Sequence, residues 1–366
     1  MSVERLAVRA GGRLLVVKTS SLGDVIHATP CLRAMHGAFP GVEISMAVDS
    51  RFAAVVAHNP NVARVIETRP RLRGPLRLPW SALLRLARRG GFDAALDLQG
   101  TRGSAALVYA SRARWKGGRG TTRPGWQLVF RPDFCRHAVR VCADITAAAG
   151  IEVAELEPEV FVAARDDEAL AASLRTRGLP GEGFLVVNPF SRWPAKDWPV
   201  ERYAELIAAV RAHHAVPIVV TGDRDEVSAA RRLLDLLPAG AATSLVGALP
   251  LAQALCLYRR ALLMVTGDSG PMHAAAALRT PVIALFGPTL PERTGPWGEG
   301  HIVIQKSRPA SHHAYRSPGE GRHMRAIEVE TVVEAVTAAL ASLRDPRGAL
   351  GWLPAAGGGS ERPRLA

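Results

Sequence analysis

Short apolar runs alternate with segments of helical spacing along most of this chain. The first run, Leu14 to Val17, is bounded by Lys18 and leads through a small-residue turn into apolar residues spaced as in a helix, from Val25 to Met35. Four consecutive apolar residues suit a buried parallel strand, and the later spacing suits a helix packed on it. Because the turn lies at the carboxyl end of the strand, we expect a ligand-binding crevice there.

The same alternation continues through the rest of the chain. Further strands are expected at residues 42–48, 62–67, 92–98, 184–188, 216–221, 244–246, 261–265, 281–286 and 301–304. Helices are expected at residues 80–89, 101–110, 134–149, 200–213, 224–237, 251–259, 269–278 and 327–343, with a short one inside 151–183. Residues 69–79 are too rich in proline for an element interior and are expected to form a loop. Alternating strands and helices predict open parallel sheets covered by helices on both faces.

The alternation of strands and helices occurs in two halves of the chain. A chain of 366 residues is expected to contain about two domains. A Pro- and Gly-rich segment within 151–183 marks the boundary, because such segments join domains. The expected division is a first α/β domain over 1–160, a second over 161–326 and a C-terminal helix over 327–346. Residues 347–366 are mostly Gly, Pro, Ala and Arg, and we expect them to be disordered.

The chain carries a formal charge of +13, which predicts an acidic partner such as nucleic acid, anionic lipid or a phosphorylated substrate. Aromatic residues make up only 5%, and no nucleic-acid recognition motif is present, which disfavours nucleic acid. No apolar run is long enough to span a membrane, and no secretion signal is visible. The four cysteines have neither zinc nor disulfide spacing, so a cytoplasmic protein is expected.

Asp24 follows the first strand and opens the first helix. An Asp at a helix start usually accepts a backbone N–H as a cap, and for an arbitrary strand–turn–helix this is the favoured interpretation. The alternative is that Asp24 lies in the ligand-binding crevice as a functional residue.

Three segments of the second half follow strands and carry candidate chemistry. In VTGDSGPMHAAAAL, a small-residue turn opens a helix whose free N–H groups suit a phosphate, with Pro271 in the first turn. Asp268 is expected to cap the turn or bind a sugar hydroxyl, because it would repel a phosphate. For His273, a buried core histidine and a site residue are about equally supported.

The other two segments are NPFSRWPAKDWP and TGDRDE. Lys196 is a candidate for contact with a pyrophosphate, although a lone lysine is usually a surface residue. A carboxylate at a strand end suits the hydroxyls of a ribose, and Glu226 is preferred to Asp225 for this role. The D-x-D triplet at Asp223 to Asp225 is treated as a chance match, and no metal site is expected. The chain lacks G-x-G-x-x-G after its first strand, which disfavours a dinucleotide oxidoreductase.

Taken together, five motifs resemble the heptosyltransferases of lipopolysaccharide core synthesis, members of glycosyltransferase family 9 with the GT-B fold. They are KTSSLGDVIHATP, ALDLQGTRGSAAL, NPFSRWPAKDWP, TGDSGPMHAAAAL and TPVIALFGPT. The opening motif looks more like the first heptosyltransferase of the pathway than the second. The chain departs from the family between Ser311 and Met324, where it has histidines in place of a cysteine-bearing segment.

The resemblance implies two Rossmann-like domains facing a central cleft. It implies inverting, metal-independent transfer of heptose from ADP-heptose to the Kdo sugar of a lipid A acceptor, without a cofactor. Asp24 would be the catalytic base. Contact with the anionic cytoplasmic face of the inner membrane is expected, since the implied acceptor is a lipid and the chain is basic.

Two groups of binding residues complete these expectations. The nucleotide sugar is expected at Ser191, Lys196, Glu226, Asp268, Ser269, Gly270 and His273. The acceptor is expected at Ser21, Gly23, Arg71, Arg73, Gln99, Arg102 and Arg123, with the basic loops 69–77 and 112–123 meeting its phosphates and carboxylates.

Three alternatives stay open from the sequence. A related glycosyltransferase would use another nucleotide sugar or a later core acceptor. A basic nucleic-acid-binding protein would be driven by net charge. A non-catalytic nucleotide sensor would bind ADP without turnover.

Overall fold

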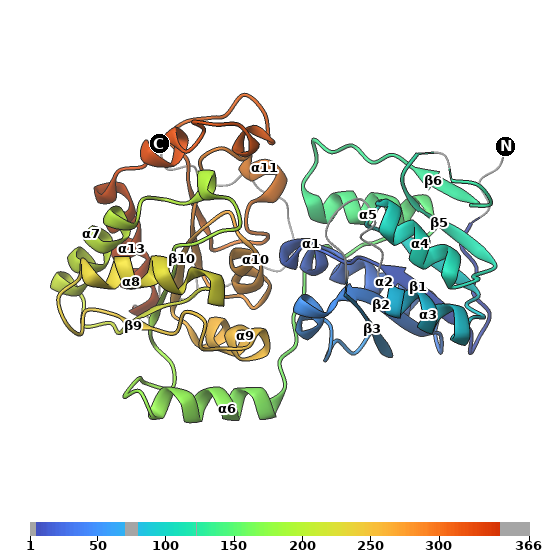
Figure 1. Ribbon diagram of the computed structural model, residues 1–366, viewed down its shortest axis with the longest axis horizontal. Coiled ribbons are helices and arrows are strands. Elements are labelled where there is room, and N and C mark those ends of the chain that lie inside the picture. The colour runs from blue at the N-terminus through green and yellow to red at the C-terminus, as the bar shows by residue number, and fades with distance from the viewer. Residues whose placement is uncertain (1–4, 70–79, 122, 345–366) are drawn as a thin grey trace. The chain divides into compact units, whose positions relative to one another are not determined.

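The computed structural model describes residues 5–69, 80–121 and 123–344, and its chain forms two compact units, Met1–Phe161 and Val162–Ala366 (Figure 1). We call them unit 1 and unit 2. The expected disordered tail and most of the expected loop at 69–79, including Arg71 and Arg73, lie outside the described residues.

Unit 1 is built on parallel strands. They are β1 (Arg13–Val17), β2 (Glu43–Asp49), β3 (Arg64–Thr68), β4 (Ala94–Asp97), β5 (Trp115–Arg119) and β6 (Leu128–Phe130). The helices are α1 (Leu22–His27), α2 (Thr29–Ala38), α3 (Trp80–Arg89), α4 (Arg102–Ala110) and α5 (Ala138–Ala148), with a 3-10 turn at Ser50–Val55.

The strand order of unit 1 is β3-β2-β1-β4-β5-β6, with parallel pairing throughout. The chain runs outward from β1 to β3 and then returns to β4 on the other side of β1. Ligands of doubly wound sheets bind at such a reversal, beyond the carboxyl ends of the two central strands. The loops that follow Val17 and Asp97 are therefore the expected ligand-binding loops of unit 1.

Unit 2 repeats this plan. Its strands are β7 (Leu185–Asn188), β8 (Ile218–Val220), β9 (Thr243–Ser244), β10 (Leu263–Gly267), β11 (Val282–Leu285) and β12 (Ile302–Ile304). Its helices are α6 (Ala164–Arg175), α7 (Val200–His213), α8 (Val227–Asp235), α9 (Leu251–Arg260), α10 (Gly270–Ala277), α11 (Pro291–Thr294), α12 (Arg322–Arg325) and α13 (Val329–Arg344). Short 3-10 turns lie at Pro194–Lys196, Arg224–Glu226 and Ala314–Arg316.

The strand order of unit 2 is β12-β11-β10-β7-β8-β9, again parallel, so the reversal falls between β7 and β10. Figure 1 shows α7, α8 and α13 on one side of β10 and α9 and α10 on the other. One buried face packs residues such as Leu185 and Val265 against Leu206 of α7 and Val336 of α13. The apolar runs thus become central strands covered on both faces, as expected from the sequence.

The expected basic loop at 112–123 is wrong in part, because Trp115–Arg119 is the buried strand β5. At Gly118, where φ is +143°, a Cβ atom would lie 2.2 Å from the Asp97 carbonyl oxygen, so β5 approaches β4 too closely for a side chain. Here glycine permits a strand contact instead of ending the strand.

Candidate functional site

Asp24 of unit 1 is placed by the turn between β1 and α1. The turn carries Lys18 directly after the strand and Ser21 at the start of the helix. The Oδ2 atom of Asp24 accepts hydrogen bonds from the Ser21 backbone N–H at 2.8 Å and from its hydroxyl at 2.9 Å. Asp24 therefore does act as a helix cap through this oxygen.

The second oxygen of Asp24 faces a buried cation. Lys18 Nζ lies 3.3 Å from Asp24 Oδ1 and donates to the Leu98 carbonyl, also at 3.3 Å. The Lys18 side chain is 4% exposed and that of Asp24 is 42% exposed. The buried Lys18 ammonium thus holds the Asp24 carboxylate in place, while part of the Asp24 side chain stays exposed to solvent.

This pairing keeps both groups charged. Burial alone would favour the neutral acid, but Lys18 and the Ser21 donors outweigh it and hold the pKa of Asp24 below its ordinary value. Burial alone would lower the pKa of Lys18, but the Asp24 carboxylate raises it above its ordinary value. Asp24 is therefore an ionised carboxylate at neutral pH.

Gln99, in the loop after β4, is hydrogen-bonded to the loop after β1. Its Oε1 accepts the backbone N–H groups of Thr19 at 3.1 Å and Ser20 at 3.2 Å. Gln99 was expected to bind the acceptor, but this oxygen is committed to the loop that carries Asp24. We read Gln99 as a positioning residue.

Two charged residues of this site, Lys18 and Asp97, were missed at the sequence level. Asp97 is fully buried at the end of β4 and accepts from the N–H groups of Gln99 and Gly100 and from the Ser104 hydroxyl. The signal was present, because Lys18 and Asp97 each sit at the end of an apolar strand. A charge in that position is costly unless it has a partner.

Other expected acceptor residues lie around the same loops. Gly23 is buried in α1, and Ser21 is exposed. Arg102 is exposed at the first position of α4, and the Arg123 guanidinium lies 3.5 Å from the Thr101 carbonyl and stacks over Trp126. The structure thus brings the Arg123 guanidinium close to Thr101, the residue that precedes Arg102.

The carboxyl ends of the central strands of unit 2 are joined by polar side chains. Asn188 Nδ2 donates to the Thr221 carbonyl at 3.1 Å, and the Thr266 hydroxyl lies 3.4 Å from Asn188 Oδ1. The Thr266 and Ser269 hydroxyls are 3.2 Å apart. This network connects the ends of β8, β7 and β10 to the start of α10.

Lys196 and Asp268 form a close ion pair at this reversal point. Lys196 Nζ lies 2.7 Å from Asp268 Oδ2, and the two side chains are 14% and 6% exposed. Burial alone would raise the pKa of Asp268, but Lys196, together with nearby His273, lowers it below its ordinary value. The structure therefore explains how an aspartate can sit beside a candidate phosphate site, because its charge is already compensated.

Ser269 and Gly270 begin α10, and both are partly exposed. His273 lies in the first turn of this helix and is 7% exposed. Ser269, Gly270 and Pro271 at this helix start are small, and the Ser269 side chain makes no capping hydrogen bond to the helix. The turn therefore has the form expected of an anion-binding helix start.

Ser191 and Glu226 lie in the loops after β7 and β8. The Ser191 hydroxyl donates to the Trp193 carbonyl at 2.9 Å and accepts the Trp193 N–H at 3.2 Å. Glu226 Oε2 accepts the Asp223 N–H at 2.6 Å, so this carboxylate also stabilises a turn. Burial and the nearby carboxylates of Asp223 and Asp197 raise the pKa of Glu226.

The segment from Ser311 to Arg316, with no expected role, packs onto Lys196. The Lys196 ammonium lies 4.7 Å from the centre of the Tyr315 ring, and Trp193 meets the same ring edge to face at 5.2 Å. Sequence reasoning missed Tyr315 because more than a hundred residues separate it from Lys196. The residues around Tyr315 in the sequence also lack the regular spacing of apolar residues that predicts a helix or a strand.

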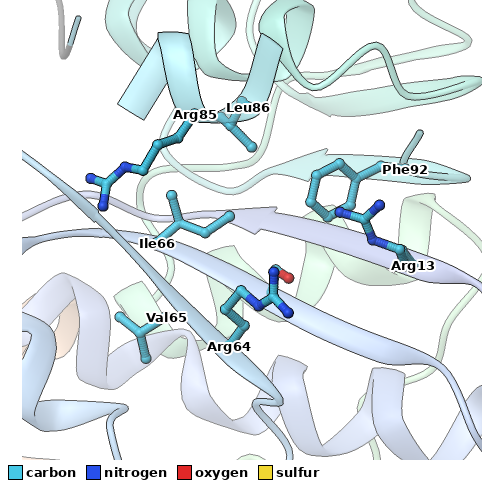
Figure 2. A pocket seen from close by; sticks show the side chains of 8 residues that line it. Arg13, Arg64, Val65, Ile66, Arg85, Leu86 and Phe92 are labelled. Atoms are coloured by element: carbon cyan, nitrogen blue, oxygen red, sulfur yellow. The ribbon is translucent and has the colours of Figure 1, made fainter. Parts of the chain in front are cut away.

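A cavity of about 60 Å³ in unit 1 is lined by Arg13, Arg64, Phe92 and others, near the amino ends of the strands and away from Asp24 (Figure 2). No three His, Cys, Asp or Glu side chains gather as metal ligands in the described part of the chain. No helix there has the length and hydropathy to cross a bilayer.

Comparison with known proteins agrees with these features. Residues 80–320 match the family model for glycosyltransferase family 9 (heptosyltransferase). The lipopolysaccharide heptosyltransferase 1 of Pseudomonas aeruginosa is 30% identical over 82% of this chain and 85% of its own length.

Two solved structures extend the likeness to the fold. The family 9 glycosyltransferase of Veillonella parvula superposes with a TM-score of 0.82 at 23% identity, covering 92% of this chain and 99% of that one. The Escherichia coli heptosyltransferase WaaC with ADP gives a TM-score of 0.68 at 25% identity, covering 89% and 99%. With two parallel α/β sheets and this sequence match, the chain belongs to glycosyltransferase family 9, the heptosyltransferase family, and is a glycosyltransferase.

Proposed function

We propose that this enzyme transfers heptose from ADP-heptose to a Kdo sugar on lipid A, with inversion at the anomeric carbon and without a metal. The observation that supports it most is the partly exposed, ionised Asp24 at the reversal point of unit 1. The proposal also draws on its relatives, which include lipopolysaccharide heptosyltransferase 1 and a heptosyltransferase crystallised with ADP.

The acceptor side of the reaction is assigned to unit 1. A Kdo hydroxyl attacks the anomeric carbon, and its proton passes to an Asp24 carboxylate oxygen as the new C–O bond forms. The low pKa of Asp24 does not prevent this step, because the hydroxyl becomes strongly acidic once its oxygen bonds to carbon. Lys18 holds the carboxylate ionised and in place.

The leaving group is assigned to unit 2. As the bond between the anomeric carbon and the phosphate oxygen breaks, negative charge develops on the diphosphate of ADP. The Lys196 ammonium and the free N–H groups at the start of α10 would stabilise that charge, the role a metal ion has in other transferases. Glu226 would bind the ribose hydroxyls.

The acceptor identity and the place of the reaction belong to the same proposal. Arg102 and Arg123, beside the Asp24 loops, would bind carboxylates or phosphates of a lipid A acceptor. Such an acceptor lies in a membrane, so we place the reaction at its cytoplasmic face, reached by peripheral contact of a basic protein.

Incubation of the enzyme with ADP-heptose and a truncated Kdo–lipid A acceptor, followed by mass spectrometry, tests the proposal. We expect the acceptor to gain one heptose and ADP to be released in equal amount. A panel of other ADP-, UDP- and GDP-sugars and of a heptosylated acceptor runs in parallel. Preference for another donor, or for the acceptor that already carries heptose, would contradict the assignment.

A further inference from the structure

Side chains of the segment Ser311–Arg316 pack over Lys196, the lysine that is paired with Asp268. Tyr315 lies against Lys196, and the Arg316 guanidinium stacks over both the Tyr315 and Trp193 rings, at 5.5 and 6.0 Å from their centres. The Tyr315 ring is therefore held on several sides.

His312 of the same segment is a neutral hydrogen-bonding group. Its Nδ1 accepts the Leu290 backbone N–H at 3.3 Å, so in the neutral ring the proton is carried by Nε2. Burial, together with the nearby Arg293 and Lys196 cations, lowers the pKa of His312 to about 4. At neutral pH it offers an uncharged N–H donor.

The strand order of unit 2 indicates which part of a bound nucleotide sugar would lie near the segment Ser311–Arg316. Glu226 follows β8 on one side of the reversal point, and Asp268 follows β10 at it. On the far side, beyond β11, lie Leu290 and Thr294, whose hydroxyl is 3.5 Å from Asp268 Oδ2. A donor with its ribose at Glu226 and its diphosphate at Lys196 would extend its sugar toward His312 and Tyr315.

We propose that Tyr315 and His312 form the subsite for the transferred sugar. The Tyr315 ring would pack against a C–H face of the sugar, and His312 Nε2–H would donate to one of its hydroxyls. An aromatic ring and a neutral donor suit a polyhydroxylated ring better than a phosphate, which is served by Lys196. This inference rests on the proposed function, because it takes the orientation of the nucleotide sugar from it.

Equilibrium binding of ADP and of ADP-heptose to the whole protein, by calorimetry, tests the inference. Because the subsite would contact only the sugar, Tyr315→Ala and His312→Ala should each weaken ADP-heptose binding by about tenfold and leave ADP binding within about twofold. Tyr315→Phe keeps the ring and should bind ADP-heptose as the wild type does. His213→Gln, at an exposed histidine that ends α7, is the matched control and should change neither affinity.

Two results would overturn the inference while leaving the proposed function standing. In the first, both variants bind ADP-heptose as tightly as the wild type. In the second, affinity for ADP falls in parallel with that for ADP-heptose, which would make the segment part of the diphosphate site. A wild-type protein that binds ADP but no more tightly when heptose is attached, and transfers none, would instead contradict the proposed function and remove the basis of the subsite.

Discussion

At the scale of single residues, each unit buries a lysine against an aspartate at the reversal point of its sheet. Lys18 faces Asp24 in unit 1, and Lys196 faces Asp268 in unit 2. The pairs differ in exposure: Asp24 is 42% exposed, whereas Asp268 is only 6% exposed. The first carboxylate can therefore meet a substrate proton, while the second mainly holds its lysine in place.

Replacing Lys196 tests how strongly the second pair is coupled. Lys196→Met leaves the buried Asp268 charge without its partner, and breaking a buried pair in this way costs about 3–5 kcal/mol. We expect a lower Tm by differential scanning fluorimetry and much weaker ADP binding. The double variant Lys196→Met, Asp268→Asn should regain much of the Tm but none of the ADP affinity. A double variant no more stable than Lys196→Met would show that the two residues are not coupled.

Asp197, next to Lys196, predicts a pH-dependent stability. Burial raises its pKa from 3.8 to about 6 in the folded protein, even though hydrogen bonds from Ser191 and the Lys196 charge oppose the shift. Between these pH values the folded state holds a proton that the unfolded state has released, so stability falls as pH rises through this window. Asp197→Asn removes this loss.

Thermal unfolding measured across pH checks this prediction. Asp197→Asn should raise the Tm above the wild-type value at neutral pH, and the gain should vanish at a pH below the ordinary value of an aspartate. Asp235→Asn, at an exposed residue that ends α8, is the control. A gain that is the same at every pH, or absent at neutral pH, would be inconsistent with a buried, protonatable Asp197.

At the scale of elements, the helices and strands that the sequence predicts well are those with clear local signals, such as periodic apolar residues and capping residues. Helix α7 spans Val200–His213, the range expected from its apolar spacing after Pro199. Helix α5, expected from residue 134, begins at Ala138 because the His137 side chain accepts the Val139 N–H and caps it there. Long strands and helices with clear periods are thus readable without the structure.

The parts that could not be predicted depend on contacts between distant residues. β5 was missed because its glycines are required by β4, and no local pattern reveals that approach. Likewise Tyr315 reaches Lys196 only through the fold. Asp24, Lys196 and Asp268 could be singled out as candidates because each follows a strand end in a recognisable motif. Their ionic partners could not be assigned from spacing alone.

Gly118 tests whether this strand contact supports the site. Gly118→Ala places a Cβ atom 2.2 Å from the Asp97 carbonyl oxygen, so β5 must move away from the strand that carries the Gln99 loop. We expect a loss of stability larger than the roughly 1 kcal/mol that glycine's backbone freedom alone accounts for, and a lower kcat. Urea unfolding and steady-state kinetics measure both.

Gly11→Ala is the matched control, because Gly11 also has a positive φ, +68°, but a Cβ atom there would meet nothing within 4 Å. The two variants should therefore differ clearly. Equal losses of stability would mean that backbone conformation, rather than the contact with β4, explains the effect.

At the scale of the whole molecule, the charge of +13 is the property most relevant to a lipid acceptor. Long-range attraction to an anionic surface is screened at distances beyond about 10 Å in 0.1 M salt. Arg102 and Arg123 contribute to this charge from unit 1. If the proposed lipid acceptor is correct, electrostatic attraction should bring the protein to an anionic membrane surface.

Co-sedimentation with vesicles tests this expectation. Binding should occur on vesicles rich in anionic phospholipid, should be absent on phosphatidylcholine vesicles, and should be lost when salt is raised toward about 1 M, where screening acts within about 3 Å. Retention on duplex DNA in the same buffer is the comparison. Equal affinity for DNA and for the anionic vesicles would argue for non-specific charge binding.

The central claim concerns what Asp24 does beyond capping α1. Asp24→Asn keeps an oxygen that accepts from Ser21 but can no longer take a proton, so single-turnover transfer of heptose by this variant separates the two roles. We predict a rate lower by about 10²–10⁴-fold, with ADP-heptose affinity close to that of the wild type and a lower Tm, because the buried Lys18 loses its charged partner. A rate within a few-fold of the wild type in a folded, donor-binding Asp24→Asn protein would contradict the account.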